Sequence, residues 1–298
     1  MSFGTALFFV ALFAGYGIRV RQPSALKRIS QSLLAITLGI LFLMGYGLGT
    51  LENMAENLML ALEMALLFLV CITLANLVGL LPTIRMITGE AVGGRPSLLG
   101  MALESLMFAG IVVVGMVVGI LVNKPFALLD SLANGLLYLM LLLIGVQLRS
   151  SDIAIKDVLL NKTGIRIAAT VVITALLGGL LAGWIAGVPV NVSLALSSGF
   201  GWYSLSGIMI GDQLGPVYGS VAFLVDLSRE LVALLLIPFV IRRNAPMAIG
   251  YGGATSMDYT LPVIERTGGV HCVPVAVASG FILSLSAPLL IPVFLGIA

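Results

Sequence analysis

Three charged residues lie close together inside an otherwise apolar stretch: Asp226, Arg229 and Glu230. A charged side chain at the centre of a bilayer costs about 2.5–3.5 kcal/mol on insertion scales. On a helix the three residues fall within an arc of roughly 100°, so all of them can face other protein or water and none needs to face lipid. Because burial favours the protonated form of a carboxyl group, such residues are suited to binding cations or carrying protons.

Arg229 can neutralise one of the two carboxylates on its helix and leave the other for a cation or a proton. The spacing does not decide which carboxylate is neutralised. Since Glu230 lies nearer the centre of the apolar stretch, we expect it to be the available one. The competing interpretation is an internally balanced cluster that only holds helices together.

A further carboxylate, Asp258, lies in the glycine-rich segment GYGGATSMDYTLP at 250–262, and a similar segment, GFGWYSLSG, occupies 199–207. Glycine disfavours continuous helix, and hydroxyl groups can satisfy the backbone groups that a break exposes. Paired interrupted segments of this kind are typical of binding sites in transporters, where half-helix N-termini hold carboxylates. The alternative is two glycine-rich helices in close contact, which gives no reason for a carboxylate in the break. The residues expected to line a cavity are Gly199, Gly201, Trp202, Tyr203, Ser204, Ser206, Thr255 and Ser256.

Glu104 lies about two turns inside another apolar segment and has no basic neighbour at helical spacing. It either faces the same cavity or is protonated within a packed interface. We include it among the candidate substrate- or proton-binding residues.

These residues must be positioned by membrane helices. Of the 298 residues, 60% are hydrophobic and only 9% are charged. Apolar runs of 18 or more residues recur along the chain, which predicts an all-α polytopic membrane protein. The sequence has no Walker A loop, which would have indicated ATP binding. A single histidine cannot build a zinc site, and Cys71 and Cys272 lie in apolar surroundings. We therefore expect no cofactor, no metal and no nucleic-acid partner.

The positions of Lys and Arg predict the topology, because these residues concentrate in cytoplasmic loops. If the segments at 190–212 and 216–241 both crossed, Arg242 and Arg243 would lie outside; if the first dips in and returns, they lie inside. We therefore expect eight full spans, two re-entrant segments and both termini outside, with a plain ten-span arrangement as the alternative. The full spans are expected at about 3–18, 31–49, 58–80, 98–122, 127–148, 167–187, 216–241 and 272–297.

The chain is expected to form one integral membrane domain over 1–298, with six spans in 1–187 and two re-entrant-plus-span units in 190–298. The two broken segments then enter from opposite faces. The last two units would be related by inversion, as repeats in many transporters are.

The sequence resembles the lysine exporter family of the LysO type over essentially its whole length. The stretches that support the resemblance are MALES at 101–105, GVQLR at 145–149, SGFGWYSLSG at 198–207, DLSREL at 226–231 and GATSMDYTLPVIERTGG at 253–269. The resemblance implies an eight-span protein of the bacterial inner membrane that exports L-lysine and its analogue thialysine. It also implies that Glu230 and Asp258 are needed for export.

Lysine has two ammonium groups and one carboxylate, so buried carboxylates and half-helix N-termini are complementary partners for it. Export of a cation against a negative interior costs about 2.3 kcal/mol per charge per 100 mV, so we expect coupling, with protons as the favoured ion and Na⁺ as the alternative. A sodium-coupled or other carrier of cationic or small amino acids is the second candidate. We expect the protein to be surrounded by membrane lipid. The sequence does not decide whether it forms a homo-oligomer.

Two other classes fit the residues less well. An intramembrane aspartyl protease needs a YD and a GxGD sequence, but here Asp258 precedes Tyr259, and Asp212 follows Ile-Gly. The serine type would have to use His271, which lies beside a loop. A passive channel or structural subunit gives no role to buried acids at broken helices. We therefore expect a transporter and not an enzyme.

Overall fold

The computed structural model describes residues 10–11, 13–51, 54–85, 98–122, 129–150 and 160–296. In these residues all regular structure is helical, and no strand is present. Seven helices are longer than twenty residues: α2 (Pro23–Gly49), α3 (Met54–Leu80), α4 (Leu98–Val122), α5 (Leu129–Ser150), α7 (Lys162–Ala186), α10 (Pro216–Val240) and α13 (Val273–Leu295). The shorter elements are η1 (Leu81–Arg85), α8 (Val190–Leu196), α9 (Tyr203–Leu214), α11 (Ala245–Gly252), η2 (Gly253–Met257), α12 (Leu261–Gly268) and η3 (Val270–Cys272).

The chain is an all-α polytopic membrane protein, as its composition predicts. By length and composition, four stretches of helix in the described residues can cross a membrane: Pro23–Gly49, Ala55–Thr83, Lys162–Ala186 and Val270–Leu295. Large apolar side chains on α3, such as Leu66 and Val78, are more than 60% exposed, which suits contact with lipid. The count of eight spans stays a prediction, because most of the first expected span, 3–18, lies outside the described residues.

Among the helices that begin earlier than expected from hydropathy are α2 and α7. The span expected at 31–49 lies in a helix that starts at Pro23, where proline is compatible with the first turn, and that includes Lys27 and Arg28. The span expected at 167–187 starts at Lys162, because the Asn161 side chain accepts a hydrogen bond from the backbone N–H of Gly164 at 2.8 Å. The first-turn proline of α2 and the capping asparagine of α7, which hydropathy does not measure, set the starts of these helices before the apolar run.

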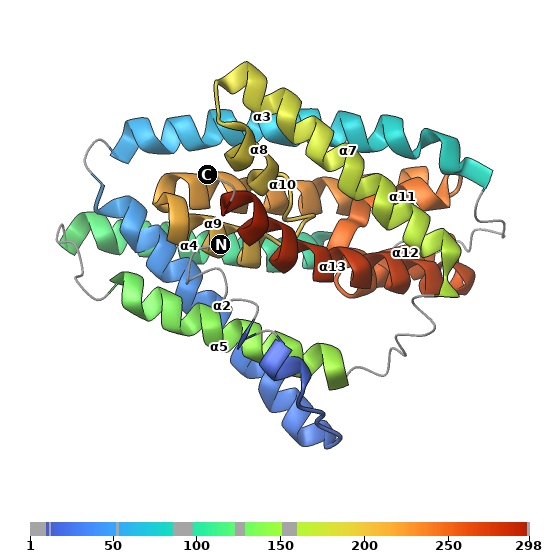
Figure 1. Cartoon of the computed structure of the whole chain (residues 1–298), viewed down its shortest axis with the longest axis horizontal. Helices are drawn as coiled ribbons and strands as arrows, with labels where there is room; N and C mark the ends of the chain where they lie inside the picture. Colours follow the sequence, from blue (N-terminus) through green and yellow to red (C-terminus); the bar gives the residue numbers. More distant parts are fainter. Residues whose placement is uncertain are drawn as a thin grey trace.

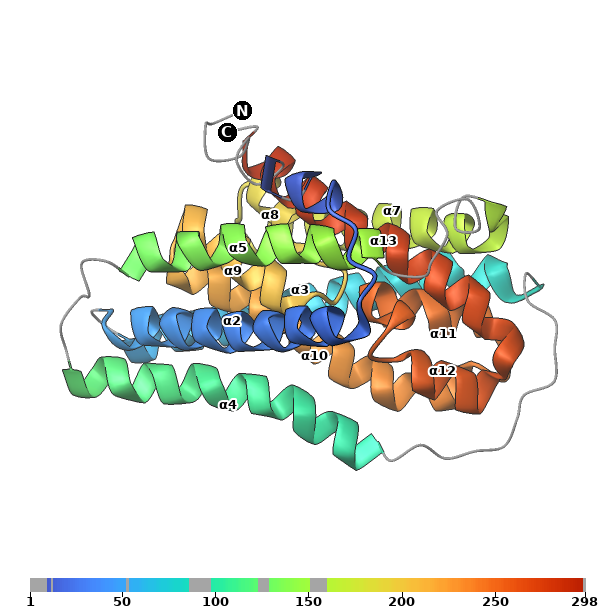
Figure 2. The same cartoon turned by 90° about the horizontal axis from the view of Figure 1, so that it is seen from below.

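Close packing of α2 on α4 depends on glycines spaced four residues apart on both helices. A Cβ atom on Gly45 or Gly49 of α2 would overlap backbone carbonyl oxygens of α4, and one on Gly115 or Gly119 would overlap those of α2. Small residues at this spacing allow helix backbones to approach in membranes. The two helices accordingly run side by side (Figure 2).

The last third of the chain lies between two groups of helices. In Figure 1, α9, α10 and α13 are flanked by α3 and α7 on one side and by α2 and α5 on the other. Contacts of α10 with α3 and α2, of α13 with α7, and of α9 with α2 and α5 agree with this arrangement. The broken segments therefore lie inside the helical assembly.

Candidate functional site

The first broken segment separates α8 from α9. The chain leaves helical conformation at 197–202, where Phe200 and Gly201 have positive φ angles of 52° and 93°. The hydroxyl of Ser198 donates to the carbonyl of Leu194 at 2.7 Å, and that of Ser197 donates to the carbonyls of Ser193 and Leu194 at 3.0 Å. These hydroxyls satisfy carbonyl groups at the end of α8, as expected for a break away from water.

The second broken segment follows α11. Gly253, with a φ of 65°, ends the helix, and η2 leads to Asp258 before α12 begins at Leu261. The Ser256 hydroxyl donates to the carbonyls of Gly253 at 2.8 Å and Ala276 at 3.0 Å. The second contact attaches the break to α13, so the position of Asp258 is set by packing against that helix.

The two breaks cross each other. The backbone N–H of Ala254 donates to the carbonyl of Phe200 at 2.9 Å, and a Cβ atom on Gly253 would overlap the same carbonyl oxygen. Backbone groups away from water must be paired, so each break supplies a partner for the other. Segments about fifty residues apart in the sequence thus meet at their non-helical positions.

Asp226 of α10 holds the first break in place. Its carboxylate accepts hydrogen bonds from the backbone N–H of Gly201 at 2.7 Å and from the hydroxyl of Ser206 at 2.5 Å. Asp226 is 2% exposed, and a Cβ atom on Gly199 would overlap its Oδ2. Asp226 is therefore engaged in positioning the start of α9.

Arg229 and Glu230 lie deep in the same region, at 2% and 3% exposed. The Arg229 guanidinium lies 5.8 Å from the ring centroid of Tyr251, and its Nε and Nη2 have no hydrogen-bond partner among the described residues. A Cβ atom on Gly253 would lie 3.2 Å from Nη2, so the guanidinium lies next to the crossing of the breaks. Tyr251, whose hydroxyl lies 2.8 Å from that of Thr73, was not among the expected site residues.

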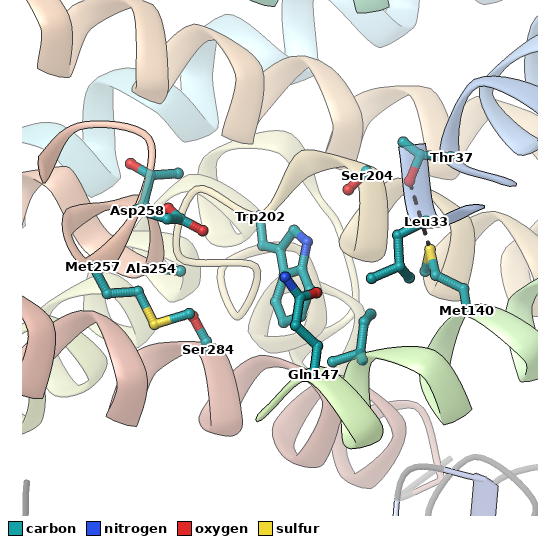
Figure 3. Close-up of a pocket in the computed structure, with 12 residues that line it drawn as sticks. Leu33, Thr37, Met140, Gln147, Trp202, Ser204, Ala254, Met257, Asp258 and Ser284 are labelled. Carbon is teal, nitrogen blue, oxygen red and sulfur yellow. Dashed lines mark hydrogen bonds between the residues drawn. The ribbon is translucent and has the colours of Figure 1, made fainter. Parts of the chain in front are cut away.

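A cavity of about 370 Å³ lies beside the crossing (Figure 3). Its volume is within the range of small-molecule sites. Its described lining residues are Leu33, Thr37, Met140, Ile144, Gln147, Trp202, Ser204, Ala254, Thr255, Met257, Asp258 and Ser284. Asp258 is the one charged residue in this set, and its side chain is exposed.

The polar groups of the cavity are spread along its length. Figure 3 shows Asp258 at one end near Met257 and Ser284, with Trp202 and Gln147 in the middle. Thr37 and Met140 lie at the other end, where the Thr37 hydroxyl contacts the Met140 sulfur at 3.9 Å. A ligand with groups at both ends of an extended chain can therefore use different partners at each end.

Four of the expected residues line this cavity: Trp202, Ser204, Thr255 and Asp258. Tyr203 instead packs against the rings of Phe108 and Phe223, at centroid distances of 5.5 and 5.6 Å.

The remaining expected residues do not appear in the cavity lining. Gly199, Gly201, Ser206 and Ser256 shape the breaks and their hydrogen bonds. Glu104 falls within α4, but its side chain lies outside the described residues.

Sequence reasoning missed the walls that α2, α5 and α13 contribute. Of these residues, Gln147 had a detectable signal, because it is a polar residue in the apolar helix α5 and lies in the GVQLR stretch. Thr37, Met140 and Ser284 have no such signal. In the described residues, no group of three or more His, Cys, Asp or Glu side chains is placed to hold a metal ion.

Comparisons with known proteins agree with one another. A sequence profile described as "Lysine exporter LysO" matches residues 109–295. The chain is 43% identical to "Lysine exporter LysO" of Escherichia coli strain K12 over 294 residues, which cover 98% of both chains. It is 38% identical over 192 residues to a Haemophilus influenzae protein described as "Putative lysine exporter", covering 64% of this chain and 97% of that one. No solved structure matches the chain. The chain therefore belongs to the LysO family of lysine exporters.

Proposed function

We propose that the protein is a secondary active exporter that moves L-lysine and its analogue thialysine out of the cytoplasm in exchange for protons. The inner membrane is its expected location. The observation that supports this function is Asp258, the one charged group among the described lining residues of a cavity formed where two helix breaks cross. The name of the Escherichia coli relative, a lysine exporter, supports the same substrate.

The cavity offers a partner for each part of lysine. Asp258 complements an ammonium group, and the ring of Trp202 gives an apolar and cation-attracting wall for the side chain. Ser204 lies in the first turn of α9, where the positive end of the helix dipole favours a carboxylate. Lysine would therefore lie with one ammonium group at Asp258 and its carboxylate near the start of α9.

Coupling follows from the energetics of export. Moving a cation out of a negative interior is uphill, and protons moving inward release the required free energy. In this proposal Asp258 and Glu230 alternate between binding protons and binding the substrate ammonium. Asp226 has a different role, because its carboxylate already accepts two hydrogen bonds at the first break.

The predicted topology places the cavity in the cytoplasmic half of the protein. Leu33 follows the basic residues Lys27 and Arg28 on α2, and Gln147 lies next to Arg149 on α5. In this orientation the protein is in an inward-facing conformation, which is the state that loads substrate for export. Both termini outside, and two inverted units in 190–298, belong to the same proposal.

The test measures efflux of labelled lysine from preloaded proteoliposomes that contain the purified protein, with no gradient, an inward proton gradient or an inward Na⁺ gradient. We expect proton-dependent efflux that is lost in Asp258→Asn and Glu230→Gln. Glu265→Gln is the matched control, since Glu265 is an exposed carboxylate on α12 away from the cavity.

Full efflux in both site variants would overturn the roles of the two carboxylates. Dependence on Na⁺ alone would replace the coupling ion. Absence of lysine flux from the wild-type protein under all gradients would overturn the substrate.

A further inference from the structure

A second cavity, of about 80 Å³, lies between α2, α5 and α9. Its described lining residues are Ile40, Leu43, Met44, Gly47, Ala133, Gly207, Ile208, Gly211, Asp212 and Pro216. Asp212 is the one charged residue in this set, and it is exposed near the C-terminal end of α9. The larger cavity thus has a smaller counterpart that also contains one carboxylate.

The two cavities follow one another along the same three helices. On α2 the lining passes from Thr37 to Ile40, and on α9 it passes from Ser204 to Gly207, each step being about one helical turn or 5 Å. On α5 it passes from Met140 to Ala133, about two turns away. The lining residues of the two cavities, taken together, therefore form a continuous path along α2, α5 and α9 from Asp258 to Asp212. We call this path the seam.

An apolar barrier separates the two cavities. It consists of Ile40 and Ile208, at the edge of the second cavity, and of Leu137, which lies between Ala133 and Met140 on α5; all three are at most 5% exposed. The contact between the Thr37 hydroxyl and the Met140 sulfur closes the nearer end of the barrier. A barrier of this kind excludes water and ions while the larger cavity is accessible, which an exporter needs in order not to leak.

We propose that the seam between α2, α5 and α9 is the exit route, and that Asp212 is a second position that binds the ammonium group of the departing substrate. The proposal rests on the proposed function and adds the path and its far end. A cation that leaves Asp258 must cross the apolar barrier, and a carboxylate at its other side lowers the free energy of that step. Gly207 and Gly211, which line the same cavity as Asp212, pack closely against Gly219 of α10 and so hold α9 in place beside it.

The first test compares lysine efflux in Asp212→Asn and Asp212→Glu. We expect efflux to fall about two- to fivefold in Asp212→Asn, the range of an exposed ion pair, and to be largely retained in Asp212→Glu. A rate of lysine efflux in Asp212→Asn equal to that of the wild-type protein would overturn the role of Asp212.

The second test maps the route by cysteine labelling in a protein with the Cys71→Ala and Cys272→Ala substitutions. Met44→Cys lies in the second cavity, and Leu139→Cys is the matched control, because Leu139 is 46% exposed on α5 and lines neither cavity. We expect an impermeant thiol-reactive ammonium reagent, added outside, to modify Met44→Cys and not Leu139→Cys, with slower modification when lysine is transported.

Modification of Met44→Cys at the same rate with and without lysine, or no modification, would overturn the route. Because each variant is compared with a wild-type protein that transports lysine, this failure is distinct from failure of the proposed function, in which the wild-type protein itself shows no lysine flux.

Discussion

At the scale of single residues, two aspartates near the crossing have opposite surroundings. Asp226 is buried and accepts hydrogen bonds from Gly201 and Ser206, whereas Asp258 is exposed to the cavity. The same kind of side chain is thus a hydrogen-bond acceptor inside the protein in one place and lines a cavity in the other. Mutations at the two positions are expected to differ in what they change.

Asp226→Ala is expected to lower stability. It removes both acceptors and leaves the buried N–H of Gly201 without a partner, at a cost of about 1–3 kcal/mol. Thermal unfolding in detergent measures this loss. Ser206→Ala, which removes one donor only, should cost less. Equal stability of Asp226→Ala and the wild-type protein would contradict the structural role.

Trp202→Ala is expected to weaken substrate binding. Loss of a cation-attracting apolar wall worth about 1–2 kcal/mol raises the lysine concentration for half-maximal efflux about five- to thirtyfold. Trp202→Phe should have a smaller effect. The control is Trp184→Ala, since Trp184 is 81% exposed on α7. A similar change in both alanine variants would show that the effect is not local to the cavity.

At the scale of elements, each break is stabilised partly by the other. The hydrogen bond from Ala254 to Phe200 pairs a backbone N–H of the second break with a carbonyl of the first. The lack of a side chain at Gly253 allows this approach, and its positive φ disfavours other residues.

Gly253→Ala is therefore expected to separate the breaks and abolish most lysine efflux, while also lowering the thermal stability of the protein. Gly110→Ala on α4 is the matched control, since no atom lies within 4 Å of the added Cβ and alanine favours helix by about 1 kcal/mol. Efflux from proteoliposomes and unfolding in detergent separate the two variants. Normal efflux in Gly253→Ala would show that the crossing tolerates a shift.

At the scale of the whole molecule, the two cavities differ in volume, about 370 and 80 Å³, and the Thr37–Met140 contact lies at the end of the larger one that is nearer the smaller. In the proposed mechanism, alternating access requires that the seam between α2, α5 and α9 change shape during each cycle. We therefore expect the helices that line the seam to move relative to one another, and α3 and α7 to move together.

Cross-linking Thr37→Cys to Met140→Cys with a short bifunctional thiol reagent is expected to stop lysine efflux, because the barrier between the cavities then stays closed. Cleavage of a reducible linker should restore efflux. The control pair is Asn76→Cys with Thr174→Cys, whose native side chains are hydrogen-bonded at 2.6 Å between α3 and α7. Unchanged efflux with the first pair cross-linked would contradict movement at this contact.

Much of the architecture could be predicted from sequence. Apolar runs predicted the membrane helices, since a bilayer imposes their length and composition. Glycines and hydroxyl-bearing residues predicted breaks near 199–207 and 250–262, and the helices end at 196 and 252. Helix starts were predicted less accurately, because Pro23 acts through its fixed φ angle in the first turn and Asn161 through a capping hydrogen bond, and neither effect is part of hydropathy.

By itself, the sequence determined the class of protein, the broken segments and the presence of carboxylates among apolar residues, because these depend on composition and local spacing. Only the tertiary structure decided where those carboxylates lie and what they contact. Spacing could not show that Asp226 binds the first break, that the breaks cross at Phe200 and Ala254, or that Gln147 lines the cavity with Asp258. Each of these depends on the packing of helices distant in sequence, which local pattern does not specify.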